Sequence, residues 1–317
     1  MLCEFANRFP KDLAILLERD RHLTRNFREE TATDMLMMGL VPLQPFGVRV
    51  DVPDESVTGA DMDWIYVAPH DVGGGSYLRL MIQAKRAKMA RLKDGSTYYY
   101  YDHLDHGTPK GSQANTLITH AATKPGGMDT LPLYMFYHPQ SALEASAPGL
   151  PAVEGVNIRL ARDIVGTVTG GCKRKEKKVS HWRGGFMTLS DLLCWPVLPM
   201  TSVPPPPGGN ATEFLLAGGF GEITYLGVAF HPELVAERIN MVRGGSARVA
   251  DPDFLVRPSE GVPPEIRRAI AGEVTEKDRK ALERPRVILS TPLTREDPLF
   301  AEARGAVTRR RGRTPGS

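Results

Sequence analysis

The sequence predicts an α/β fold in which a mixed central sheet is flanked by helices. Near the N-terminus apolar residues recur at three- and four-residue spacing, the spacing of a helix that packs by one face. In the following segments apolar and polar residues alternate, as in half-buried strands, and residues 131–137 form a dense apolar run typical of a buried strand. A chain of 317 residues is long enough to bury a sizeable core, as one elaborated domain or two smaller ones.

The periodicity indicates an order of elements for the first half of the chain. Residues 11–40 have helical spacing and form two helices or one kinked helix. Three strands are expected next, over residues 46–50, 61–68 and 77–84, with the last two joined as a hairpin by the glycines at 73–75. Helices over residues 85–93 and 112–122 and a strand over 131–137 complete this half.

The second half is less regular, and its clearest break is the Pro-Pro-Pro-Pro-Gly-Gly run at residues 204–209. Beyond this break we expect helices over residues 232–241 and 264–282 and a short strand over 286–290. Residues 303–317 contain five arginines and no acid, which is typical of a disordered basic tail.

Charge and cysteine content limit the class of protein. The formal net charge is +3, but the five tail arginines account for it, so the rest of the chain is near neutral and can bind nucleic acid only through local patches. The cysteines at 3, 172 and 194 show no paired spacing, so neither a disulfide framework nor a zinc site is expected. With no secretory signal and no long apolar run, we expect a cytoplasmic protein without a membrane span.

One set of residues has the chemistry of a phosphodiesterase. Asp61 opens one strand of the hairpin, and Gln83 and Lys85 end the other, 22 and 24 residues later, so both can converge on Asp61. Glu29, or its neighbour Glu30, lies on the second helical segment and can approach the same point. Oxygen ligands suit Mg²⁺ or Mn²⁺, and a lysine can neutralise charge that develops on a phosphoryl group.

These residues resemble the PD-(D/E)xK nuclease superfamily, in the Mrr-like variant with Gln-x-Lys, and are closest to an uncharacterised bacterial branch of it. The resemblance is carried by Glu29-Glu30-Thr31, by the step from Gly59 to Trp64 and by Gln83-Ala84-Lys85-Arg86, followed by Gln113 and a strand ending in Phe136-Tyr137. It implies a restriction-endonuclease-like core, with Asp61, Gln83, Glu29 and Asp63 as candidate metal ligands. We favour Asp61 over Asp63 and Glu29 over Glu30.

The same resemblance implies a division of the chain and a function. Residues 1–141 would form the nuclease-like core, 142–207 its continuation, 208–302 a C-terminal extension and 303–317 the tail. The expected activity is Mg²⁺-dependent endonucleolytic cleavage, of DNA rather than RNA, in prokaryotic restriction or phage defence, with a homodimer or a defence-system protein as a further partner. The alternative is an inactive nuclease-fold module that binds nucleic acid or a partner protein.

Two basic segments are candidates for contacts with the phosphate backbone. Arg86, Lys88 and Arg91 follow the lysine of the site directly, and residues 173–178 read Lys-Arg-Lys-Glu-Lys-Lys. The sequence also allows both segments to be solvated surface with no ligand.

Overall fold

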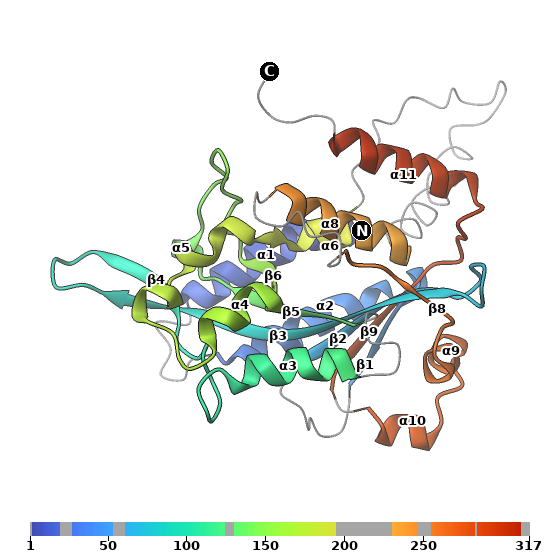
Figure 1. Cartoon of the computed structure of the whole chain (residues 1–317), viewed down its shortest axis with the longest axis horizontal. Coiled ribbons are helices and arrows are strands. Elements are labelled where there is room, and N and C mark those ends of the chain that lie inside the picture. Colours follow the sequence, from blue (N-terminus) through green and yellow to red (C-terminus); the bar gives the residue numbers. More distant parts are fainter. Residues whose placement is uncertain are drawn as a thin grey trace.

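The computed structural model describes residues 2–19, 27–52, 61–123, 130–194, 230–245, 255–282 and 284–311. Its centre is a nine-stranded sheet in the order β1-β9-β2-β3-β5-β6-β7, with β4 and β8 each paired to β3 (Figure 1). The strands are β1 (Val48–Asp51), β2 (Met62–Ala68), β3 (Ser76–Arg91), β4 (Thr97–Tyr101), β5 (Thr130–Tyr137), β6 (Val156–Leu160), β7 (Met187–Thr188), β8 (Ser259–Glu260) and β9 (Arg286–Ser290). Because β2 pairs with β9 and β3 with β5 in parallel while the other pairs are antiparallel, the sheet is mixed, as predicted.

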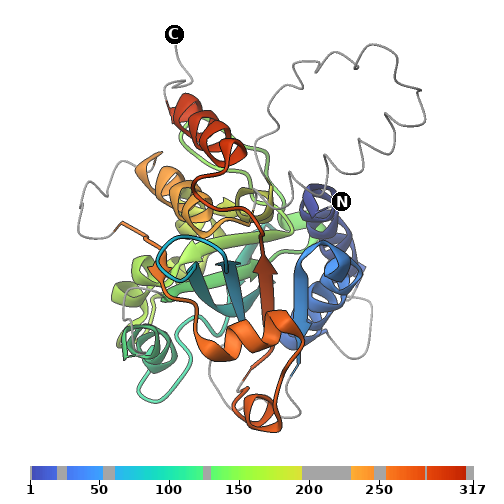
Figure 2. The same cartoon turned by 90° about the vertical axis from the view of Figure 1, so that its right-hand side faces the viewer.

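Helices cover both faces of this sheet (Figure 2). They are α1 (Leu2–Arg19), α2 (Glu29–Leu40), α3 (Ser112–Thr123), α4 (Ala161–Val168), α5 (Val179–Trp182), α6 (Leu189–Leu193), α8 (Pro232–Gly245), α9 (Pro264–Ala271), α10 (Glu276–Lys280) and α11 (Pro298–Arg311). One face packs against α1, α2, α6 and α8 through residues such as Trp64 and Leu80. The other packs against α3 and α4 around Met81 and Phe136, and against α9 around Ile65. The predicted α/β class is therefore confirmed.

The β2–β3 hairpin forms where the sequence predicts it, with Met62 opposite Ile82 and Ala68 opposite Ser76. Its turn contains the three glycines at 73–75, whose φ angles of 80°, 88° and 85° lie in a region that side chains disfavour. The register is what aligns the start of β2 with residues 82–84 of β3.

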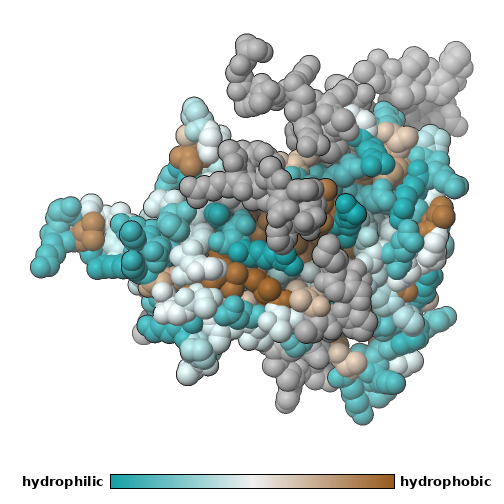
Figure 3. Space-filling model, in the orientation of Figure 1, coloured by the Kyte–Doolittle hydropathy of each residue, from teal (hydrophilic) through white to brown (hydrophobic). Residues whose placement is uncertain are grey.

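The helix expected over residues 85–93 is wrong, because β3 continues through them to Arg91. Lysine, arginine and alanine favour a helix locally, but here β3 pairs with β5 as far as Arg86 and then with β4 from Ala87. Residues 87–101 form a two-stranded arm that projects beyond the helices, at the left of Figure 1. Figure 3 shows a mainly hydrophilic surface on this arm.

The residues assigned to a C-terminal extension include one strand of the central sheet. Strand β9 lies between β1 and β2 in the central sheet, so residues 286–290 complete the core that the N-terminal segments begin. Helix α11 continues to Arg311, so the expected disordered tail is helical over residues 303–311. The expected turn at 53–59, the Gly59-Ala60 step, the proline run at 204–209 and residues 312–317 lie outside the described residues.

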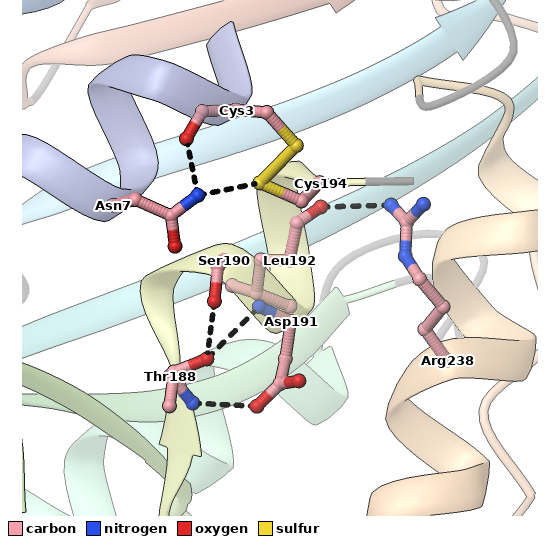
Figure 4. Close-up of a disulfide and its surroundings, with 8 residues drawn as sticks. All are labelled: Cys3, Asn7, Thr188, Ser190, Asp191, Leu192, Cys194 and Arg238. Atoms are coloured by element: carbon pink, nitrogen blue, oxygen red, sulfur yellow. Dashed lines mark hydrogen bonds between the residues drawn. A yellow bond between two sulfur atoms is a disulfide. The ribbon is translucent and has the colours of Figure 1, made fainter. Parts of the chain in front are cut away.

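Cys3 and Cys194 form a disulfide between α1 and the end of α6, so the expectation of unpaired cysteines is wrong for this pair (Figure 4). The two residues are 191 positions apart, and only the packing of α1 against α6 brings their Cα atoms to 4.8 Å. A sequence spacing cannot show such a pair. Among the described helices none has the length and apolar character needed to cross a membrane.

Candidate active site

The site lies at the edge of β3, where β2 begins and leaves backbone groups of β3 without a strand partner. There the carboxylate of Asp61 accepts a hydrogen bond from the backbone N–H of Ala84. Two residues further, Glu29 Oε1 accepts the backbone N–H of Arg86 at 3.1 Å. The N–H groups of Ala84 and Arg86 are two residues apart and therefore point to the same edge of β3. Because each N–H binds one of the two carboxylates, both acidic side chains lie at that edge.

Lys85 lies between these two contacts along β3, and its side chain is 5% exposed. Its Nζ lies 3.7 Å from Glu29 Oε2 and donates a hydrogen bond of 3.2 Å to Gln113 Oε1 on α3. The lysine therefore connects the acid on α2 with an amide on the opposite face of the sheet. A buried ammonium held by one carboxylate and one amide has a fixed position, as a catalytic cation requires.

Asp61 is the residue whose electrostatics are most perturbed. Burial raises the pKa of its carboxyl from the ordinary 3.8 to about 6, against the lowering effects of the Ala84 N–H and of Lys85. The charges of Glu29 and Glu30 raise this pKa further. A carboxylate held near other acids in a buried position binds a divalent cation favourably, because the cation removes the repulsion between them.

Glu29 is positioned by the first turn of α2. The hydroxyl of Thr33 donates to the backbone oxygen of Glu29 at 3.2 Å and lies 3.1 Å from the hydroxyl of Tyr137. Glu30 is exposed on the neighbouring side of the helix and, unlike Glu29, makes no hydrogen bond or ion pair with the described residues of β3. Glu29, which the sequence analysis also favours over Glu30, is thus the acid of this pair that contacts β3 and Lys85.

Gln83 and Asp63 have different surroundings, although both are buried. Gln83 is 1% exposed and lies opposite Asp61, one step beyond the Met62–Ile82 pair. Asp63 instead binds the guanidinium of Arg79, and its Oδ2 lies 3.6 Å from Arg284 Nε. Asp63 is thus the anion of an arginine cluster and not a member of the group around Lys85.

The residues present fit a divalent cation. Asp61, Glu29, the amide of Gln83 and the carbonyl of Ala84 offer hard oxygen donors, and the carbonyl of Ala84 points to the same side of β3 as its N–H. Within the described ranges no group of three or more His, Cys, Asp or Glu side chains is placed to hold a metal ion, so two acids would need the neutral oxygens as co-ligands.

A model of the DUF6615 family, described as a family of unknown function, matches residues 2–296. The chain belongs to this family. No curated protein matches the chain, and no solved structure does. The match includes every residue of the candidate site, from Glu29 to Gln113, and extends through β9.

In this family member the two basic segments of the sequence lie side by side. Lys178 forms a bridge with Tyr100 of the arm, and its Nζ lies 4.7 Å from the ring centre of Tyr98. Arg174 donates a hydrogen bond of 2.5 Å to the hydroxyl of the same Tyr98. Residues 87–101 and 173–178 together contain eight cations and two acids, a net charge of +6.

The three residues chosen as phosphate contacts are placed unequally on this surface. Arg86 is half-buried and binds the backbone oxygen of Phe27, so it supports the site. Lys88 is paired with Asp102 at 2.9 Å, and Arg91 is exposed near the tip of the arm. Of these three residues, Arg91 alone is exposed and has no acidic partner among the described residues.

Sequence reasoning did not find the arginines around Asp63. Arg79 lies on β3, whereas Arg284 and Arg286 lie just before and at the start of β9, more than 200 residues later in the chain. The alternation in β3 alone does not indicate that these residues meet. One feature of the sequence indicates such a cluster: Arg79 is a charged residue in a mainly apolar strand, and a charge that is buried there requires a partner.

Proposed function

We propose that the chain is a metal-dependent nuclease that hydrolyses phosphodiester bonds of DNA with Mg²⁺ or Mn²⁺. The observation that carries this proposal is the convergence of Asp61, Glu29 and Lys85 on one edge of β3. Two carboxylates and a buried lysine supply the oxygen donors and the fixed positive charge that phosphodiester hydrolysis needs.

Each side chain has a role in this scheme. Asp61 and Glu29, with Gln83 and the carbonyl of Ala84, would hold the cation, which when bound supplies Lewis-acid polarisation of a phosphoryl oxygen. Lys85 neutralises negative charge that develops on the phosphate and donates hydrogen bonds to it or to the attacking water. Gln113 holds Lys85 in position through the 3.2 Å hydrogen bond, so it is a positioning residue.

The arm and the segment at 173–178 support the choice of nucleic acid as substrate. The arm begins two residues after Lys85 on the same strand, so its cations lead away from the site toward the tip at about 3.3 Å per residue. One nucleic-acid backbone could therefore contact the cations of the arm and place a phosphate at Lys85. A cytoplasmic setting, a role in restriction or phage defence and a homodimer or protein partner belong to the same proposal.

One observation favours a second function, in which the fold binds nucleic acid without cutting it. Asp61 and Glu29 each bind a backbone N–H group of β3, and this contact alone gives both acids a structural role at the sheet edge. An inactive module would retain the acids for that role and use only the basic surface.

Plasmid and linear DNA, and a structured RNA, should be incubated with Mg²⁺, Mn²⁺ or EDTA and with wild type, Lys85→Met and Lys280→Met. Lys280 is exposed on α10 and, within the described part of the chain, is paired only with Glu276, so it is a matched lysine control. We expect cleavage of DNA with either metal, no cleavage in EDTA, and loss of activity in Lys85→Met alone. Binding without cleavage under every condition would support the inactive module. Cleavage of RNA but not of DNA would show that RNA is the substrate and contradict the assignment of DNA.

A further inference from the structure

A cavity of about 670 Å³ lies between α9, α10 and the face of the sheet formed by β2, β3 and β9. Five cations line it, from three different regions of the chain: Arg79, Arg268, Lys277, Arg284 and Arg286. Among the residues that the structure describes, its acids are Asp63, Glu265 and Asp278, which leaves these lining residues with a net charge of +2. These cations outnumber the acids, so an anion that enters the cavity would reduce the remaining repulsion among them.

The existing ion pairs satisfy only part of this charge. Arg268 binds both carboxylate oxygens of Asp278, at 2.9 and 2.5 Å, and Arg79 and Arg284 share Asp63. Within the described part of the chain, Arg286 makes no ion pair, and its buried Nε–H, like that of Arg79, has no hydrogen-bond acceptor.

The electrostatic surroundings of Arg286 are those of a cation that lacks a close anionic partner among the described residues. Burial lowers the pKa of its guanidinium, and the neighbouring Arg79 cation lowers it further, against the opposite effects of Asp51 and Asp63. Buried donors in proteins nearly always have an acceptor. The guanidinium groups of Arg79 and Arg286 line the cavity, so an anion there would give Arg286 the ion pair that it lacks among the described residues.

The rest of the lining indicates what kind of anion fits. Ile65, Ile266 and Leu282 give the cavity apolar walls, and Tyr77 adds an aromatic ring. Its volume is in the range of small-molecule sites, which combine apolar walls with a few polar groups. Guanidinium groups bind phosphate in a forked geometry, and a doubly charged phosphate would balance the charge of +2.

We propose that this cavity binds a nucleotide, with the phosphate on Arg79, Arg284 and Arg286 and the base against the apolar walls. The inference does not rest on the nuclease proposal, because it concerns binding alone. Asp63 is two residues from Asp61 on the same strand, so the bound phosphate would lie about 7 Å along β2 from the candidate catalytic carboxylate. A free nucleotide and a nucleotide within a nucleic-acid strand share this chemistry, and the experiments below distinguish them.

Binding of AMP, GMP, CMP, UMP, adenosine and inorganic phosphate should be measured by calorimetry in EDTA, with the full chain. We expect at least one mononucleotide to bind with a dissociation constant below about 1 mM, and adenosine and inorganic phosphate to bind at least tenfold more weakly. Arg286→Gln and Lys277→Gln should each weaken the binding about tenfold. Lys280→Gln is the control, because this lysine lies on α10 outside the cavity lining and should leave binding unchanged.

A short single-stranded oligonucleotide separates the two sources of the nucleotide. Displacement of the bound mononucleotide by this oligonucleotide, lost in Arg286→Gln, would assign the cavity to a nucleotide of a nucleic-acid strand, and failure to displace it would assign the cavity to a free nucleotide. Absence of mononucleotide binding, equal binding of inorganic phosphate, or equal affinity in wild type and Arg286→Gln would overturn the proposal. None of these results depends on cleavage, so the nuclease proposal would stand or fall separately.

Discussion

Replacing Asp61 with asparagine should stabilise the fold while it removes the proposed metal ligand. The carboxyl pKa of about 6, against an ordinary 3.8, means that folding opposes ionisation of this group by up to about 3 kcal/mol. Part of Asp61 reaches the surface, so we expect a gain of about 1–3 kcal/mol at pH 7.5. Asparagine keeps an oxygen that can accept the Ala84 N–H, so the contact at the sheet edge remains.

The sign of this effect depends on pH in a defined way. Below pH 3.8 the carboxyl is protonated in both the folded and the unfolded chain, so Asp61→Asn should change stability little. As the pH rises from 3.8 to about 6, the unfolded chain ionises first and the wild type loses stability relative to the variant. The full gain of the variant should therefore be present above pH 6.

Urea denaturation in EDTA at pH 4 and pH 7.5 measures the difference. Asp63→Asn is the matched control two residues further along the chain and should act in the opposite direction, because it leaves the guanidinium of Arg79 without its carboxylate partner, at a cost of about 3–5 kcal/mol. An Asp61→Asn protein that is less stable than wild type at pH 7.5 would refute the argument that burial and the neighbouring acids strain this carboxylate.

Three further predictions concern the lysine, the arm and the disulfide. Lys85→Met should lower the rate of DNA cleavage by about 10²–10³-fold, measured in single turnover, whereas retention of activity would remove the lysine from the mechanism. Neutralising Arg91 and Lys93 together should reduce the log–log salt slope of duplex binding by up to about 1.8, and an unchanged slope would mean that the arm faces away from DNA. Cys194→Ser should lower the free energy of unfolding by about 2–5 kcal/mol under oxidising conditions through loss of the bond to Cys3, with no effect of reductant on the variant.

The local periodicity of the sequence was sufficient for most elements near the site. The hairpin of β2 and β3, the helix at 112–123 and the strand at 130–137 all form within a few residues of their expected positions. This hairpin has strong local signals, since alternating residues and three glycines determine its register. The choice of Asp61 over Asp63 agrees with the geometry, because only Asp61 reaches the backbone beside Lys85.

The features that the sequence did not predict depend on contacts between distant segments. Residues 85–93 have helix-forming composition, but hydrogen bonds to β5 and β4 make them a strand. Strand β9 enters the sheet from nearly 200 residues beyond β3, and the disulfide and the arginine cluster form through equally distant contacts. Periodicity describes which face of an element is apolar and contains no information about which partner covers that face.

The site and the cavity have a common structural origin in the sheet. One face of β3 carries every second residue from Arg79 to Lys85, namely Arg79, Met81, Gln83 and Lys85. Helix α3 covers this face near Lys85, and α9 and α10 cover it near Arg79. A polynucleotide strand that places one phosphate at Lys85 and follows this face would meet the guanidinium of Arg79, which binds Asp63 opposite Met81, about 13 Å further along β3. If the cavity holds a nucleotide of the substrate, Arg286→Gln should raise the KM for oligonucleotides long enough to span this distance and leave the cleavage of shorter ones unchanged.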